Sequence, residues 1–523
     1  MGNLAREPIE SGRNNNEPIE TSLSGDPWPA AVKAFIRFPY NRSRTSRKPV
    51  KSKLFPLFAA TLILTQSARS AQFTWDGGTG TWDSTTTNWG GLAWGNTNAD
   101  EAVFGGTAGT VTISTGAGVI ANKVTFNTDG YVINGNTSSD VLNLAGTTPT
   151  VTLSTGLSAT IDAVISGTAG LTKSGTGSLT LNGANTYTGT TTLSGGTLFV
   201  GHVDALSGAL TGSGASTLRL ATDSSVSAFQ LNSTTNSSYT VVADRATPGA
   251  AITHVLGTSS LGGGTSTITF QTGSNVTSGT AAISLASLTL SAGSTNLTTT
   301  LNPTTATVTI VGNVDRTSGL IKTLKLDGTI AGNTIDGVIS NGTGAGASMA
   351  VTKSNTSTWT LNNTASTYTG VTTISAGALE AASLANGGSN SSIGASTNAA
   401  TNLVFGASSA ILRYIGSSNV TTDRGFTTSS GTGGGATIES SGTGTLGLDN
   451  TVAIALGTTN QTRTITLGGS NTGSNTFSKV LANNGNSATS LTKNGTGTWT
   501  LDGTAANTHT GTTTVNGGTL HLT

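Results

Sequence analysis

Apolar and polar positions alternate along most of the chain after residue 70. The segments Ser-Leu-Thr-Leu (178–181), Thr-Ile-Thr-Phe (267–270) and Thr-Trp-Thr-Leu (358–361 and 498–501) place an apolar side chain at every second position. Such alternation is typical of strands with one buried face, because successive side chains of a strand point to opposite sides. The periodicity of amphipathic helices is almost absent. We therefore predict an all-β protein.

Three segments repeat one another, at 171–200, 351–380 and 491–523. Each contains Leu/Val-Thr-Lys, then Leu/Trp-Thr-Leu, then Thr-Tyr/His-Thr-Gly-x-Thr-Thr, and each ends in a Gly-containing turn before a final apolar position. This order predicts three strands joined by turns, with Leu/Val-Thr-Lys leading into the first strand. One repeat is too small to bury a core, so we expect the repeats and the strand-rich segments between them to stack as coils of a β-solenoid.

A short preface precedes the first two repeats. It reads Ile-Asp-Ala-Val-Ile-Ser at 161–166 and Ile-Asp-Gly-Val-Ile-Ser at 335–340, and it is echoed only weakly at 477–481. The spacing between the repeats is uneven. The sequence therefore predicts related coils separated by divergent ones.

The repeats resemble the autotransporter-associated β-strand repeat, also called the passenger-associated transport repeat. The resemblance rests on Leu-Thr-Lys-x-Gly-x-Gly, Thr-Tyr-Thr-Gly-x-Thr and Gly-Gly-Thr-Leu. It implies a right-handed parallel β-helix that is exported as an autotransporter passenger and displayed at, or released from, the cell surface. Three positions depart from the pattern. Asn355 and Ala376 stand where the other repeats have Gly, and His509 stands where they have Tyr.

Four of the seven Trp residues lie close together, at Trp75, Trp82, Trp89 and Trp94. They belong to a Trp-Asp-Gly-Gly-x-Gly-x-Trp-Asp motif and to the Asn-Trp that follows it, and the Asp-Gly and Gly-Gly pairs indicate tight turns. Clustered Trp side chains bury large apolar areas. We therefore interpret 71–110 as a cap that closes one end of the stack. The alternative hypothesis is that the four Trp side chains contact glycans.

A secretory signal peptide is predicted at 50–70. Two Lys residues precede an apolar run at 54–64, and small residues follow it, which is the usual order in such peptides. The run is too short to span a bilayer as a helix, so we expect no stable membrane span. Cleavage is expected between Ser70 and Ala71. Residues 1–49 are interpreted as a disordered leader or, alternatively, as a mis-assigned start.

Residues 111–523 form the predicted β-solenoid passenger. The family resemblance implies an anchoring or sorting region after the passenger. The last residues, 519–523, lie inside the third repeat. We therefore expect the sequence to be a truncated passenger.

Composition narrows the function. Charged residues make up 9% of the chain, well below the usual quarter of a soluble domain, and there is no Cys. Basic residues are concentrated before the apolar run, and the rest of the chain carries a slight excess of acidic residues, so we expect no nucleic-acid partner. The absence of Cys excludes disulfides, thiolate metal sites and a Cys nucleophile.

The residue types used in catalysis are few and scattered. His202, His254, His509 and His521 show no metal-ligand spacing, and the acidic residues lie far apart in the sequence. Asp100 and Glu101 are adjacent, and we interpret them as a solvated turn. We expect no enzyme activity, no cofactor and no metal. A β-helix polysaccharide-active enzyme stays open as a less favoured alternative.

The sequence therefore predicts an exported, adhesin-like structural passenger that acts as a β-solenoid stalk at the cell surface or outside the cell. The expected partners are surface glycans or the surface of a host or neighbouring cell, together with the secretion machinery during export. The alternative is a carbohydrate-binding surface protein that uses the Trp cluster.

Overall fold

The computed structural model describes residues 71–523 except 263, 292–296, 318–320, 344–345, 429–433 and 450–451. These residues belong to one compact unit, Gln66–Thr523. The predicted leader at 1–49 and the predicted signal peptide at 50–70 lie outside the described residues.

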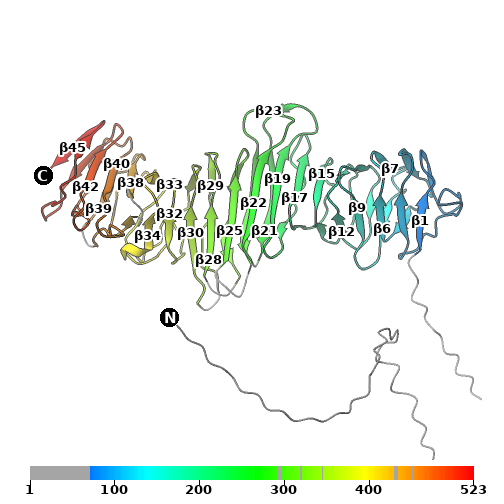
Figure 1. Cartoon of the computed structure of the whole chain (residues 1–523), viewed down its shortest axis with the longest axis horizontal. Helices are drawn as coiled ribbons and strands as arrows, with labels where there is room; N and C mark the ends of the chain where they lie inside the picture. Colours follow the sequence, from blue (N-terminus) through cyan, green and yellow to red (C-terminus); the bar gives the residue numbers. More distant parts are fainter. Residues whose placement is uncertain are drawn as a thin grey trace, which may run out of the picture. The chain divides into compact units, whose positions relative to one another are not determined.

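The described secondary structure consists of β-strands and one short 3-10 helix, η2 (Ala400–Asn402). The strands stack along the chain in two long sheets and three smaller ones (Figure 1). The 20-stranded sheet contains β1 (Gln72–Trp75), β3 (Glu101–Phe104), β6 (Lys123–Phe126), β9 (Thr150–Leu153), β12 (Leu171–Ser174), β14 (Thr191–Leu193), β16 (Leu210–Gly212), β18 (Leu231–Ser233), β21 (Thr253–Leu261), β24 (Ala282–Leu290), β26 (Thr307–Ile310), β27 (Val314–Arg316), β29 (Asn333–Ile335), β31 (Thr358–Leu361), β33 (Gly377–Ala381), β35 (Ala410–Tyr414), β38 (Gly435–Ser440), β40 (Arg463–Gly468), β42 (Thr489–Lys493) and β44 (Thr513–Val515).

The second long sheet has 15 strands among the described residues. They are β2 (Gly80–Trp82), β4 (Thr110–Ile113), β7 (Tyr131–Gly135), β10 (Ser158–Ile161), β13 (Ser178–Leu181), β15 (Gly196–Val200), β17 (Ser216–Ala221), β19 (Ser238–Asp244), β22 (Ser266–Thr272), β25 (Leu297–Pro303), β28 (Lys322–Leu326), β30 (Met349–Lys353), β32 (Thr372–Ile374), β34 (Leu403–Phe405) and β37 (Thr427–Thr428).

The three smaller sheets complete the coils. One contains β5 (Val119–Ala121), β8 (Leu142–Leu144) and β11 (Ile165–Ser166), and another contains β20 (Gly249–Ala250) and β23 (Val276–Ser278). The third, towards the C-terminal end, contains β36 (Val420–Thr422), β39 (Leu446–Leu448), β41 (Asn475–Phe477), β43 (Thr498–Leu501) and β45 (Thr519–Leu522).

Successive coils pair in parallel. Strand β12 pairs with β14, which lies one coil later in the chain, and β13 pairs with β15 in the same way. The chain thus alternates between sheets, and each strand forms hydrogen bonds with the coils before and after it. This arrangement confirms the predicted parallel β-solenoid.

The core is a column of apolar side chains inside the coils. Strands such as β9, β13, β26 and β31 alternate half-buried Thr or Ser with buried Val, Leu, Ile or Trp, as the sequence pattern predicts. One hydrophobic cluster extends from Trp75 to Leu501. Burying each such side chain contributes roughly 1.5–3 kcal/mol, and the outward Thr side chains suit an exposed strand because they are β-branched.

Each repeat forms four strands in two coils rather than the predicted three strands. In the first repeat these strands are β12, β13, β14 and β15, and the Leu-Thr-Lys segment that we interpreted as a lead-in is strand β12 itself. The second repeat uses β30 to β33 and the third uses β42 to β45 in the same pairing. A repeat is therefore one pair of stacked coils.

The repeats do not all start in the same sheet. The Lys-containing strands β12 and β42 belong to the 20-stranded sheet, whereas β30 belongs to the 15-stranded sheet. The three repeats thus use different combinations of sheets: the first uses the 20- and the 15-stranded sheet in that order, the second uses them in the reverse order, and the third uses the 20- and the five-stranded sheet.

Candidate functional site

The four Trp side chains of the predicted cap lie inside the protein. Trp75, Trp82, Trp89 and Trp94 are between 0% and 3% exposed, and their rings meet one another at centroid distances of 4.8 to 5.1 Å. Trp82 and Trp89 also pack against Phe104 of β3, so the cluster covers the first coils. No ring face is presented to solvent. Glycan contact by these side chains stays a prediction, and it would require this cluster to open.

The polar residues of the Trp motif hold its turns. Asp76 accepts a hydrogen bond from the backbone N–H of Gly90 at 2.7 Å, and Asn88 donates to the carbonyl of Thr81 at 2.9 Å. Asp83 accepts from the backbone N–H groups of Thr85 and Thr86. Although burial opposes it, these bonds lower the pKa of Asp83. Of the predicted cleavage residues, Ser70 lies outside the described residues and Ala71 is exposed before β1, so the cleavage site stays a prediction.

Each repeat contains a fully buried Lys whose ammonium binds three backbone carbonyls. Two carbonyls belong to the turn that follows the Lys, and the third belongs to the corresponding turn one coil later. The Nζ–O distances are 3.1, 2.9 and 3.1 Å from Lys173 to Ser174, Gly175 and Gly195; 2.6, 2.8 and 3.1 Å from Lys353 to Ser354, Asn355 and Ala376; and 2.6, 3.0 and 3.1 Å from Lys493 to Asn494, Gly495 and Gly517. We call this arrangement the lysine clasp.

The lysine clasp joins two coils through charge-assisted hydrogen bonds, which are stronger than neutral ones. Burial lowers the pKa of Lys173 and of Lys353 to about 8, and it also lowers the pKa of Lys493. At neutral pH the side chains of Lys173 and Lys353 are therefore mainly ammonium ions with three N–H donors, matching the three carbonyls. The clasp explains why Lys recurs at an inward position of an apolar strand.

The two glycine departures are accommodated by the geometry of this turn. Asn355 has φ +54°, close to the +72° and +70° of Gly175 and Gly495 in the other repeats, and Asn tolerates this left-handed conformation better than most residues. Ala376 replaces Gly195 and Gly517, where an added Cβ would meet no atom closer than 3.2 Å. Gly377, which follows it, has φ +67°, and a Cβ there would lie 2.7 Å from the Lys353 ammonium.

The Tyr or His of each repeat makes a second recurring contact within its unit. Tyr187 and Tyr368 are buried and hydrogen-bond through their hydroxyls to Thr191 and Thr372, at 2.5 and 2.8 Å. His509 occupies the same place and reaches Thr513 through Nε2 at 3.3 Å. His509 therefore substitutes structurally for Tyr, as the repeat alignment predicts.

The preface is present before all three repeats, including the third, where the sequence offers only a weak echo. In every case a polar side chain of the preface bonds a polar side chain of the next coil, and a preface backbone N–H donates to another. The side-chain pairs are Asp162–Asn182 (2.8 Å), Asp336–Asn362 (2.6 Å) and Ser478–Asp502 (2.5 Å), and the backbone pairs are Ile165–Asn185, Ile339–Ser366 and Leu481–Asn507. The third preface is hard to recognise in the sequence because its carboxylate, that of Asp502, belongs to the next coil rather than to the preface.

The candidate catalytic residue types are not brought together. In the described part of the chain no group of three or more His, Asp or Glu side chains is placed to hold a metal ion. His254 is buried and hydrogen-bonds the carbonyl of Asp244 at 2.9 Å, whereas His202 lies at the surface beside Asp204.

The interpretation of Asp100 and Glu101 as a solvated turn is wrong for Asp100. That carboxylate is buried and accepts a hydrogen bond from the backbone N–H of Thr97 at 2.8 Å, because the turn is packed into the cap. Glu101 forms an ion pair with Lys123 at 2.7 Å.

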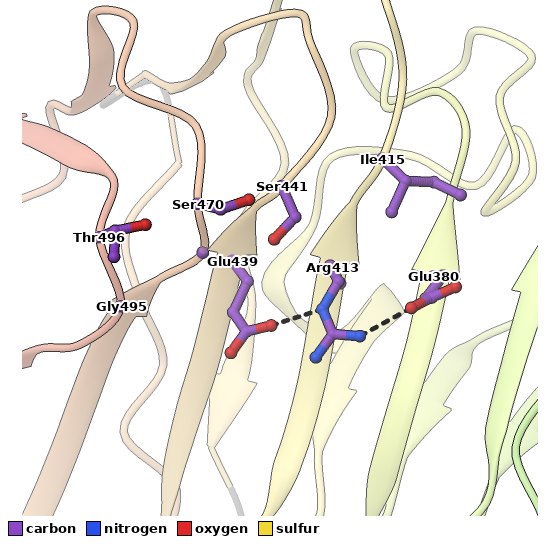
Figure 2. A pocket seen from close by; sticks show the side chains of 9 residues that line it. Glu380, Arg413, Ile415, Glu439, Ser441, Ser470, Gly495 and Thr496 are labelled. Atoms are coloured by element: carbon purple, nitrogen blue, oxygen red, sulfur yellow. Dashed lines mark hydrogen bonds and ion pairs between the residues drawn. The ribbon is translucent and has the colours of Figure 1, made fainter.

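A hollow on the outer surface crosses three strands of the 20-stranded sheet. This ion-pair groove, of about 540 Å³, is lined by Glu380, Arg413, Ile415, Glu439, Ser441, Gly469, Ser470, Gly495 and Thr496. Glu380, Arg413 and Glu439 are in register on β33, β35 and β38. Figure 2 shows the Arg413 guanidinium between the two carboxylates, with Nη1 2.7 Å from Glu380 and Nε 2.6 Å from Glu439.

The electrostatics and the shape of this groove have simple causes. Burial acts to lower the pKa of Arg413, but hydrogen bonds to Glu439 and Glu380 outweigh it and raise the pKa. Gly468 faces Glu439 on the next strand, where the lack of a side chain leaves the hollow open. Ser441, Ser470 and Thr496 place hydroxyls along it (Figure 2). The groove can therefore offer hydrogen-bond donors and acceptors to a polar ligand, with one more negative than positive charge.

This groove could not be predicted from the sequence. Its three charged residues are far apart in the chain, and they meet only because each coil has a particular length. The one sequence feature that pointed to the groove is Arg413, a charged residue at an outward position of the alternating strand Ala410–Tyr414.

The segments with the lysine clasp match a known family. Residues 171–199, 351–381 and 491–522 match the passenger-associated-transport-repeat family. The chain carries three passenger-associated-transport repeats. Each of these repeats coincides with one two-coil unit of the fold. Of the residues that the structure describes, none belongs to a helix with the length and hydropathy needed to cross a lipid bilayer.

One curated relative is similar over part of its length. It is the adhesin BmaC autotransporter of Brucella suis biovar 1 (strain 1330), 46% identical over 147 residues. The match covers 28% of this chain and 4% of the relative, so the chain spans a small fraction of that protein. No solved structure matches the chain.

Proposed function

We propose that this chain is an exported, adhesin-like passenger whose β-solenoid acts as a stalk and presents contact surfaces outside the cell. The observation that carries the proposal is the coincidence of three passenger-associated-transport repeats with three clasped two-coil units. The similarity to an autotransporter named as an adhesin supports the same role.

The role is proposed to be non-enzymatic. The relative is named an adhesin, and the polar groups of the ion-pair groove suit binding, since the carboxylates are engaged by Arg413 rather than free for acid–base chemistry. The proposed partner is the surface of a host or neighbouring cell. The secretion machinery is the proposed partner during export.

The proposed domain organisation follows this role. Residues 50–70 act as the signal peptide, 71–110 form the N-terminal cap, and 111–523 form the passenger. The buried Trp cluster supports the cap, because it covers apolar side chains of the first coils that water would otherwise reach.

Export is tested by expressing the full chain in a Gram-negative host and fractionating the cells. We expect the protein in the periplasmic, outer-membrane or medium fraction, with a mature N-terminus at Ala71 by peptide sequencing. Retention of the uncleaved chain in the cytosol would contradict the proposal.

Adhesion is tested by coating beads with the purified chain and counting the beads retained by cell monolayers under flow. A Glu380→Gln and Glu439→Gln double variant tests the ion-pair groove, and Glu101→Gln, which breaks an ion pair elsewhere, is the matched control. We expect retention well above uncoated beads, reduced by the groove variant and not by the control. Retention no better than with uncoated beads would rule out the adhesive role.

A further inference from the structure

A second groove lies where the coils become longer, between β17 and β19. In the 15-stranded sheet, β15 ends at Val200 and β17 at Ala221, but beyond Asp244, the last residue of β19, the chain continues outwards into the pair β20 and β23. This pair stands clear of the neighbouring strands in Figure 1. The groove at its foot, which we call the step groove, has a volume of about 260 Å³ and is lined by Thr180, Asn182, Phe199, Gly201, Arg219, Ala221, Asp244, Arg245, Ala246 and Asn275.

A buried carboxylate, that of Asp244, lies at the end of β19, where the chain turns outwards. Asp244 has no exposed side-chain surface, accepts a hydrogen bond from Arg219 Nε at 2.6 Å, and accepts another from the backbone N–H of Asn275 at 3.0 Å. Asn275 in turn donates to the carbonyl of Arg245 at 2.9 Å. Polar groups are costly to bury unless they are paired, and in the described coils the interior is otherwise mainly aliphatic. The fold therefore maintains a polar corner at a concave surface, where ligand sites usually form.

The step groove presents guanidinium groups to solvent, and each of them is ion-paired with a carboxylate. Its charged lining residues are Arg219, Arg245 and Asp244, and the side chains of the two arginines are 26% and 21% exposed whereas that of Asp244 is 0% exposed. Arg245 is partly compensated by Asp223, which lies outside the lining, at 3.2 Å. Arg219 keeps a donor for a ligand, because its hydrogen bonds within the described residues run through Nε and Nη2 and leave Nη1 unused.

Arg219 is held in a fixed position. Its guanidinium lies 5.3 Å from the centroid of the Phe199 ring, and Nη2 donates to the hydroxyl of Ser274 at 2.6 Å. A guanidinium fixed in this way has lost its rotamer freedom before a ligand arrives, which favours binding. Asn182 and Thr180 add amide and hydroxyl groups beside the half-buried Phe199 ring.

We propose that the step groove binds a carboxylate-bearing sugar residue of an acidic glycan. The carboxylate pairs with Arg219, the sugar hydroxyls bond to Asn182, Thr180 and Asn275, and the ring packs beside Phe199. The groove volume of about 260 Å³ lies just below the ~300–1,000 Å³ of pockets that hold drug-sized ligands, so the groove has room for about one sugar ring. This inference rests on the proposed adhesive function and gives it a ligand class.

The test is calorimetric titration of the purified chain with a trimer of galacturonic acid. A neutral galactose trimer and inorganic phosphate are the comparison ligands, because they separate recognition of the carboxylated sugar from recognition of any sugar or any anion. Ala221→Leu narrows the groove without removing a charge, and Arg219→Gln removes the proposed carboxylate donor. Lys325→Gln is the control, since Lys325 is an outward basic residue of the same sheet outside this groove.

We expect the uronate trimer to bind at least about ten-fold more tightly than the galactose trimer, and both Ala221→Leu and Arg219→Gln to weaken it about ten-fold or more. Because Arg219→Gln leaves Asp244 buried without its partner, the double variant Arg219→Gln, Asp244→Asn keeps the test valid if the single variant unfolds. Equal binding of the two trimers, equal binding of phosphate, or unchanged binding by Ala221→Leu would overturn the inference. If beads coated with the chain still adhere to cells in that case, the adhesive function stands and only the ligand class falls.

Discussion

The lysine clasp of the second repeat makes a quantitative prediction. Lys353→Met keeps most of the aliphatic stem but removes the donor shared by the carbonyls of Ser354, Asn355 and Ala376. An acceptor that loses its partner costs roughly 1–3 kcal/mol when it is buried. These carbonyls belong to an exposed turn where water can replace part of the loss, and removing a buried charge offsets some of it. We therefore expect a net loss of about 2–4 kcal/mol in local stability.

The measurement is hydrogen exchange of backbone amides, because a long stack of coils need not unfold in a single step. The amide of Ser375, which donates to the carbonyl of Lys353 at 2.7 Å, reports directly on the two clasped coils. Peptides from 351–381 should lose protection, while peptides from 171–199 should be unchanged. Lys325→Met is the matched control, because Lys325 lies on the neighbouring strand β28 but points outwards. Unchanged protection in Lys353→Met, or an equal loss in the control, would refute the clasp.

Three other predictions follow from the same contacts. Burial lowers the pKa of Lys173 and Lys353 from 10.5 to about 8. Between these two pH values the unfolded state binds more protons than the folded state, so the free energy of unfolding should rise with pH from about 8 to about 10.5. Denaturant titrations at both pH values should show a smaller rise in Lys353→Met, and an identical rise would count against the buried ammonium. Gly377→Ala should destabilise the second repeat by more than ~2 kcal/mol, since its Cβ would meet Lys353 Nζ and the carbonyl of Ser357. Gly388 has a similar φ but open space around it, so Gly388→Ala should cost only about 1–2 kcal/mol. Thermal denaturation of both variants measures the difference. Trp82→Ala should cost roughly 3–5 kcal/mol and expose 71–126 to proteolysis, with Leu92→Ala, 60% exposed, as a control that leaves the cleavage rate unchanged.

The fold was predictable to the extent that its determinants are local. The alternation in Thr-Trp-Thr-Leu and the recurrence of three similar segments were sufficient to predict a stack of coils, and the family resemblance implied that the strands pair in parallel. The strand Leu171–Ser174 was missed because Lys173 occupies an inward position, where its charge breaks the apolar alternation. Its partners are carbonyl groups, which every residue carries, so the sequence holds no signal for them.

The candidate sites were less predictable for a different reason. Glu380, Arg413 and Glu439 lie on consecutive coils, and Arg219 meets Asp244 across two neighbouring strands. Which outward residues become neighbours depends on the number of residues in each coil. Coils in this chain differ in length, so a shift of one or two residues in any turn would separate these charges. Only the registers of the strands define the grooves.

The placement of the three repeats on different combinations of sheets has a consequence for how such proteins can change in length. Both long sheets accept a repeat, because the lysine clasp closes on turn carbonyls of the repeat itself and needs nothing specific from the sheet it starts in. A gene encoding this architecture could therefore gain or lose part of a coil between repeats without disturbing them. Recombination between the similar segments would yield foldable stacks of many lengths, and each would turn its repeats towards a different side of the molecule.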